Sequence, residues 1–129
     1  MALITTICWA LLALLHLAPA AVLAMPGLTQ SLYQLDPNGT AGVLIIHRGA
    51  LFLGIVVVAV WAAFDHRARP VASVVTAISM IGFLLVYARA GLPDGALRTI
   101  AIADLIGLAP LAIASYQCWV RTCEIDPMG

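Results

Sequence analysis

The stretch AGVLIIHRGALFLGIVVVAVWAAF, residues 41–64, is apolar apart from His47 and Arg48. It is longer than the ~20 apolar residues that an α-helix needs to cross a bilayer. The polar cluster DHRAR, residues 65–69, follows it directly and marks its end. The stretch therefore predicts a membrane-spanning helix.

Three further apolar runs flank this stretch, and each predicts another span. The four helices are expected at about residues 2–24, 41–64, 70–88 and 96–120. Pro26-Gly27 stops the first run, and Pro70 suits the first turn of the third helix. The turn-rich sequence GLPDG at residues 91–95 separates the last two helices. Because the connections are short, we expect one domain over residues 1–129, an all-α, integral-membrane antiparallel four-helix bundle.

Two details concern the N-terminal part of the chain. Val22-Leu23-Ala24 resembles the cleavage site of a signal peptide. No positively charged residue precedes the apolar run, however, so a retained helix is the better interpretation. Residues 28–35 carry leucines at helical spacing, and they predict a short helix at the membrane interface.

The composition excludes several classes of protein. Hydrophobic residues make up 64% of the chain and charged residues 9%, whereas a soluble domain carries about 25% charged residues. A soluble enzyme and a disordered tail are therefore excluded. Six arginines balance six acidic residues and lysine is absent, so no basic patch is available for nucleic acid. The three cysteines, Cys8, Cys118 and Cys123, lack the spacing of a zinc site or of a disulfide framework.

Four spans place both termini at one end of the bundle, which we call side A; the connections near residues 25–40 and 91–95 lie at the other end, side B. Three tryptophans fall towards side A, as in an aromatic belt: Trp9, Trp61 and Trp119. The arginines at side A are Arg67, Arg69 and Arg121, and those at side B are Arg89 and Arg98, with Arg48 close by. This balance favours cytoplasmic termini in a bacterial inner membrane, with the lipid bilayer as a partner.

Almost every ionisable group within the spans is expected in the side-B half. His16, His47 and Asp104 are expected on the order of 9–12 Å below the side-B boundary. Tyr87, Arg89 and Arg98 lie close to that boundary. Such groups are costly in lipid and by default mark a site. A structural interpretation stays open, in which Arg48 and Asp104 pair across facing helices, directly or through water, and His16 bonds a backbone carbonyl freed by Pro19.

One hypothesis makes this polar cluster a ligand site. The bundle would bind or transform a small lipophilic molecule, with His47, Asp104 and Tyr87 as candidate catalytic residues. His47 and His16 are also candidate axial ligands of a haem, whose propionates Arg48 would meet. A homo-oligomer fits this hypothesis.

The other hypothesis makes the chain a non-catalytic accessory subunit of a larger membrane complex. The charges would then pair inside the bundle or across an interface with another subunit. Ala50 and Gly54 share a helix face with His47. Small residues of this kind let helices approach closely, and they also leave room for a flat ligand.

Four stretches resemble a family of small bacterial four-span membrane proteins: residues 47–52 (HRGALF), 61–65 (WAAFD), 78–83 (ISMIGF) and 97–105 (LRTIAIADL). Some members of that family carry an adenylyltransferase name, and no activity is assigned to it. The resemblance covers most of residues 10–115 and implies the four-span fold.

A few positions are also similar to the styrene oxide isomerases, four-span membrane enzymes that open epoxides to aldehydes and hold haem b between the subunits of a trimer. The shared positions are His47-x-Gly49, Gly54, Tyr87, Asp104 and the LAP of residues 108–110. The similarity implies that His47 is the haem ligand and that Tyr87 lies near the substrate. Leu53 stands where that family has its catalytic asparagine, which argues against the same reaction.

Overall fold

The computed structural model describes residues 2–120 of the 129-residue chain; Arg121 and Cys123 lie outside the described residues. The elements in chain order are α1 (Ala2–Ala21), α2 (Leu28–Tyr33), α3 (Thr40–Phe64), the 3-10 turn η1 (His66–Ala68), α4 (Arg69–Arg89) and α5 (Ala96–Trp119). Each of the helices α1, α3, α4 and α5 is long and apolar enough to cross a membrane.

The expected fold is confirmed, because four long apolar helices pack antiparallel. The helices α3, α4 and α5 begin and end within one residue of their expected ranges, but α1 ends at Ala21, three residues early. Pro19 lies inside α1 and has no backbone N–H. The carbonyl of Leu15 therefore loses its helical partner, and the chain leaves the helix two residues after the proline.

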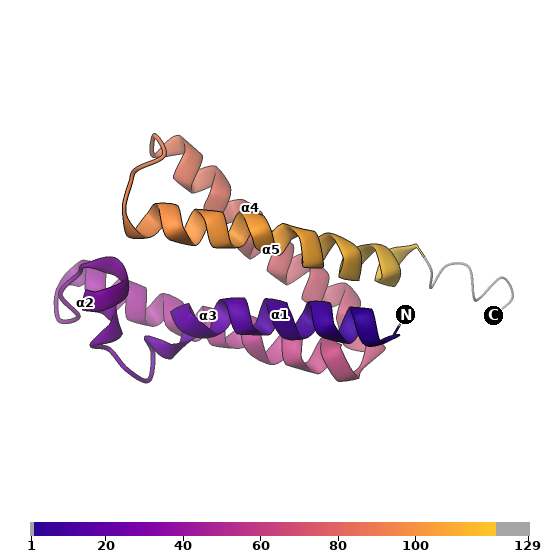
Figure 1. Cartoon of the computed structure of the whole chain (residues 1–129). Helices are drawn as coiled ribbons and strands as arrows, with labels where there is room; N and C mark the ends of the chain where they lie inside the picture. Colours follow the sequence, from indigo (N-terminus) through magenta and orange to yellow (C-terminus); the bar gives the residue numbers. More distant parts are fainter. Residues whose placement is uncertain (1, 121–129) are drawn as a thin grey trace, which may run out of the picture.

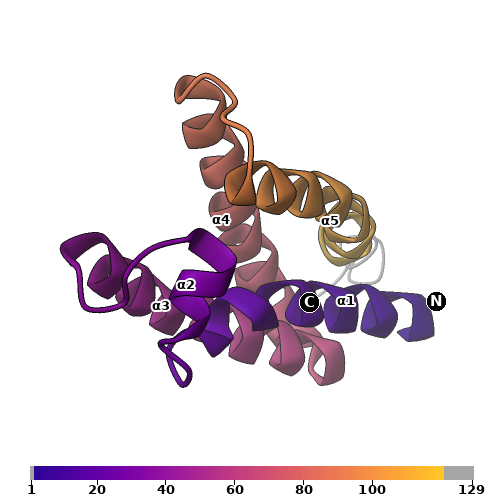
Figure 2. The ribbon, with the colours of Figure 1, turned by 60° about the vertical axis from the view of Figure 1, so that its left-hand side comes forward.

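The four long helices form a ring in the order α1, α3, α4, α5, in which α5 closes on α1. In Figure 1, α1 runs along α3, and α4 pairs with α5. After the turn that joins it to α3, α4 diverges from that helix. Figure 2 shows the far end of α4 standing away from α1 and α3. The bundle is therefore closely packed at side A and splayed at side B.

The packed core lies towards side A. Trp9 and Leu12 of α1 are fully buried there, together with Ala59 of α3. Since α1 packs between α3 and α5, Trp9 faces other helices, and its expected place in an aromatic belt is wrong. Trp61 and Trp119 are 57% and 54% exposed, so their side chains are available to the membrane interface.

Hydrogen bonds between elements hold the side-A end together, and most of them involve only uncharged groups. The Thr6 hydroxyl donates to the Ala63 carbonyl (3.1 Å), the Trp119 indole donates to the Ser73 hydroxyl (3.0 Å), the Arg69 Nε donates to the Ala62 carbonyl (3.0 Å), and Thr5 bonds Gln117. These bonds tie α1 to α3 and α5, and α4 to α5.

Candidate functional site

A cavity of about 620 Å³ lies in the side-B half, where α4 diverges from α3. All five α-helices contribute to its walls, and so does the end of the turn before α5. Its lining residues come from α2 and from the parts of α1, α3 and α5 near α2, and Figure 1 shows these segments together at one end of the bundle. Its size is that of a site for a small molecule, for which cavities of about 300–1,000 Å³ are typical.

The cavity brings together three of the five residues that the sequence proposed for a site. His16 of α1, Arg48 of α3 and Asp104 of α5 all line it. His47 and Tyr87 do not. Three of the ionisable residues that the sequence placed together in the side-B half therefore line one cavity, and two of the proposed residues lie outside it.

His16 is the most buried of these polar side chains, at 2% exposure. Its Nδ1 lies 2.8 Å from the carbonyl oxygen of Leu12, one turn earlier in α1. Because a carbonyl only accepts, Nδ1 carries a proton, and in the neutral ring Nε2 keeps its lone pair. Within the described residues, this buried Nε2 has no hydrogen-bond partner. The carbonyl that His16 uses is that of Leu12, and not the one that Pro19 frees.

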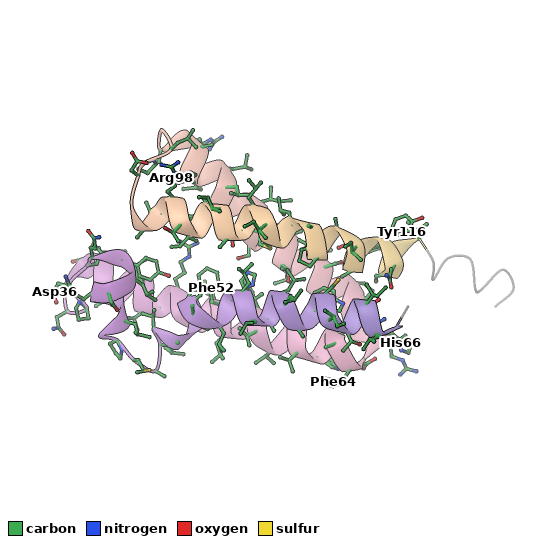
Figure 3. All side chains as sticks on the ribbon, viewed as in Figure 1. Asp36, Phe52, Phe64, His66, Arg98 and Tyr116 are labelled. Atoms are coloured by element: carbon green, nitrogen blue, oxygen red, sulfur yellow. The ribbon has the colours of Figure 1, made fainter. Side chains whose placement is uncertain are left out.

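Phe52 of α3 lies between His16 and Arg48. Its ring centroid is 5.8 Å from that of His16 and 5.0 Å from the Arg48 guanidinium carbon. The same guanidinium carbon lies 5.4 Å from the ring centroid of Phe83 on α4. Figure 3 shows Phe52 pointing into the space between α5 and the α1–α3 pair. Two cation–π contacts therefore position the positive charge of Arg48 at the wall of the cavity.

Arg48 and Asp104 line the same cavity from α3 and α5, but they are not a direct ion pair. Between residues 2 and 120, Arg98 forms an ion pair with Asp94 (2.9 Å), and the ring Nδ1 of His66 lies 4.0 Å from the Asp65 carboxylate. The expected direct contact between Arg48 and Asp104 is therefore absent. Its physical reason is that the two phenylalanine rings hold the guanidinium of Arg48 towards α4.

The short helix α2 contributes Tyr33 to the cavity, a residue that the sequence did not single out. Burial raises the pKa of the Tyr33 phenol, and the positive charge of Arg48 acts in the opposite direction. The leucine spacing of residues 28–35 predicted this helix, but it gave no indication that the helix folds back over a cavity. Gln34 ends α2 in a left-handed conformation (φ 58°), which turns the chain towards α3.

His47 is exposed on the outer face of α3, together with Ala50 and Gly54. Consecutive residues point about 100° apart around a helix, so when Arg48 faces the cavity its neighbour turns away. His16 and His47 therefore do not face a common space. A haem with these two histidines as axial ligands does not fit this arrangement.

Tyr87 takes part in local structure at the end of α4. Its hydroxyl donates to the Pro93 carbonyl oxygen at 3.1 Å, and its ring stacks on Phe83 with 6.2 Å between the centroids. It lies beside a separate hollow along α4 and α5, which Arg98 shares. Its contact with Phe83 still links it indirectly to the wall of the main cavity.

Comparisons of the chain with protein-family models, with curated proteins and with solved structures found no match. The resemblances to the small four-span family and to the styrene oxide isomerases therefore stay predictions. What is established is a helical membrane protein with four long apolar helices.

Proposed function

We propose that this membrane protein binds a small lipophilic molecule in the side-B cavity. The observation that carries the proposal is an apolar cavity of about 620 Å³ whose wall includes His16, a buried side chain whose Nε2 has no hydrogen-bond partner within the described residues. Small-molecule sites are typically apolar hollows in which a few polar groups orient the ligand. The cavity has both parts.

The polar groups of the wall differ in their chemistry. His16 offers a hydrogen-bond acceptor, Arg48 offers only donors, and Asp104 offers a carboxyl group. An apolar body would fill the space around Phe52 and Phe83, and a polar end would meet these groups. If the protein transforms the molecule, as in an isomerisation, His16 is the group placed to take a proton, and Arg48 is placed to stabilise a developing negative charge.

Filling the cavity tests this proposal. The probe is 4-octylphenol, and bound molecules are counted by native mass spectrometry of the detergent-solubilised protein. Ala103→Phe places a ring in the cavity, and Ala112→Phe makes the same change at an exposed position of α5. We expect Ala103→Phe to weaken binding by about tenfold or more, and Ala112→Phe to leave it unchanged. Absence of binding to the wild type, or equal binding to both variants, would contradict the proposal.

A second candidate function is that of an accessory subunit in a membrane complex. The specific observation in its favour is the outer face of α3, where His47 is exposed beside Ala50 and Gly54. A polar side chain facing lipid is costly, and small residues allow another helix to approach closely.

Purification from native membranes in a mild detergent tests this second candidate. Foreign subunits in fixed proportion that Gly54→Leu releases would support it. A wild-type chain that purifies alone, or only with copies of itself, would contradict it.

A further inference from the structure

We infer that the molecule bound in the side-B cavity carries a neutral hydroxyl group, as in a lipophilic phenol or alcohol, which donates its hydrogen bond to Nε2 of His16. This inference rests on the proposed function and specifies the chemical class of its ligand.

Only one of the two ring nitrogens of His16 is hydrogen-bonded. Nδ1 is bound to the Leu12 carbonyl of the same helix, at 2.8 Å. Nε2 lies on the opposite edge of the imidazole, so it faces away from that stretch of the α1 backbone. Phe52, which also lines the cavity, packs against the ring with an interplanar angle of 40°. The unpartnered nitrogen is therefore not directed at the Leu12 carbonyl, and the ring that carries it lines the cavity.

The unpartnered Nε2 of His16 requires a hydrogen-bond donor. In the neutral ring Nε2 is an acceptor, and a buried acceptor without a partner is unfavourable. Phe52 offers no O–H or N–H, and the guanidinium of Arg48 lies over Phe52 and Phe83 instead. Neither of these neighbours supplies the missing hydrogen, and a bound molecule with an O–H or N–H group would supply it.

The charged groups around His16 favour a neutral donor group on the bound molecule. Arg48 and His16 flank the same Phe52 ring, so an ammonium group at His16 would lie near a positive charge. A carboxylate has only acceptors to offer, and it would leave Nε2 of the neutral ring unsatisfied. Asp104, the acidic residue of the wall, adds a further acceptor. A neutral hydroxyl fits best, because it donates to His16 while its oxygen remains available to the donors of Arg48.

A matched pair of probes tests the inference without any substitution. 4-Octylphenol carries the hydroxyl, and 1-fluoro-4-octylbenzene has nearly the same shape but no donor. Each is titrated separately against the wild-type chain, and binding is read by native mass spectrometry. We expect the phenol to bind about tenfold more tightly. Equal binding of the two probes would overturn the inference.

Two histidine variants assign the preference to one residue. His16→Phe should remove the preference, and His16→Gln, which keeps a polar atom near the position of Nε2, should retain part of it. His47→Phe makes the same change on the outer face of α3, and it should leave the preference intact. A preference that survives in His16→Phe would overturn the inference. If His16→Phe does not fold, the probe pair on the wild-type chain and the His16→Gln variant still test the inference.

The outcomes separate this inference from the proposal on which it rests. Equal binding of both probes that Ala103→Phe abolishes would keep the cavity as a lipophilic site and refute the hydroxyl preference. Binding of neither probe to the wild type would refute both.

Discussion

At the scale of single residues, the charge of Arg48 is accommodated by aromatic rings. Its guanidinium carbon lies 5.0 Å and 5.4 Å from the ring centroids of Phe52 and Phe83, and no carboxylate of the described residues forms an ion pair with it. Cation–π contacts of this kind contribute from ~0.5 kcal/mol to ~2 kcal/mol, more where water is excluded. The donors of Arg48 therefore remain free to meet a ligand in the cavity.

A double-mutant cycle tests this placement of Arg48. We expect Arg48→Gln and Phe83→Leu to show a coupling of about 1 kcal/mol in the free energy of unfolding, because each substitution removes the cation–π contact between Arg48 and Phe83. The cycle of Arg48→Gln with Asp104→Asn should give a smaller coupling, since these side chains are not in direct contact. Detergent-based unfolding measures both. A larger coupling with Asp104 would show that the charges are paired after all.

At the scale of elements, Gly49 determines how closely α3 approaches the end of α1. A Cβ at this position would lie 3.1 Å from the Leu23 nitrogen and 3.3 Å from the Pro19 carbonyl oxygen. Both are backbone atoms, which cannot move aside as a flexible side chain can. Gly54 lies on the same helix, and a Cβ there would meet nothing within 4 Å.

The pair Gly49→Ala and Gly54→Ala tests this close approach. We expect Gly49→Ala to destabilise the bundle by about 1–3 kcal/mol through overpacking. Gly54→Ala should be neutral or stabilise it by up to ~1 kcal/mol, because alanine is the better helix former. The measurement is the free energy of unfolding in one detergent. Equal effects of the two substitutions would contradict the packing described for α1 and α3.

The turn between α3 and α4 is organised by Asp65. Its carboxylate accepts the backbone N–H of Arg67 at 2.9 Å and the indole N–H of Trp61 at 3.2 Å. The backbone hydrogen bond from Arg67 is the main cause that lowers the pKa of the Asp65 carboxyl below its ordinary value, with Trp61 as a further cause.

This arrangement makes a prediction about pH. A carboxyl whose pKa is lowered by folding stabilises the folded state above its ordinary pKa of about 4, and the contribution disappears as the pH falls through the lowered value. Asp65→Asn should therefore lower Tm at pH 7, and the difference from the wild type should shrink on acidification. Asp94→Asn, at an exposed carboxylate of the other turn, is the control. A Tm difference that is independent of pH would contradict this role of Asp65.

The sequence was sufficient for the helices, because four long apolar runs punctuated by Pro26-Gly27, Pro70 and residues 91–95 leave few alternatives. It also predicted that His16 and Asp104, with Arg48 close by, lie in the side-B half, and these three residues line one cavity there. The direction of each side chain was harder to predict. The rotation of α3 is set by packing of Gly49 against α1, and one step along the helix turns His47 out of the cavity.

The cavity itself has no signal in the sequence. It exists because α4 diverges from α3 and because α2 folds back, so that residues far apart in the chain share one wall. The contact between Arg48 and Phe52 could have been predicted from the sequence, because the two residues are four apart, the spacing at which side chains meet on a helix. Nothing in the sequence pattern placed Phe83 opposite them.

At the scale of the whole molecule, the two ends of the bundle differ. At side A, hydrogen bonds between α1, α3, α4 and α5 close the bundle around its core. At side B, the helices separate around a cavity. We therefore expect a ligand of the proposed site to enter from the side-B half of the membrane, because the packed core lies between the cavity and side A.

The topology behind this description predicts that the two interhelical turns lie on opposite faces of the membrane. In a chain whose native cysteines are replaced by serine, Arg67→Cys and Asp94→Cys should react with an impermeant maleimide from opposite sides. Arg67 lies in η1, and Asp94 lies in the turn before α5, with its side chain 86% exposed. Reaction of both from the same side would refute the four-span topology.

The most direct test of the central claim, a ligand site inside the side-B half, is protection of a cysteine in the cavity wall. In the chain without native cysteines, Ala103→Cys lies in that wall and Ala112→Cys lies on an exposed face of α5. The rate of reaction with methyl methanethiosulfonate is measured with and without 4-octylphenol. We predict that the probe slows the reaction at position 103 several-fold and leaves position 112 unaffected. Equal slowing at both positions, or no slowing at position 103, would contradict the account.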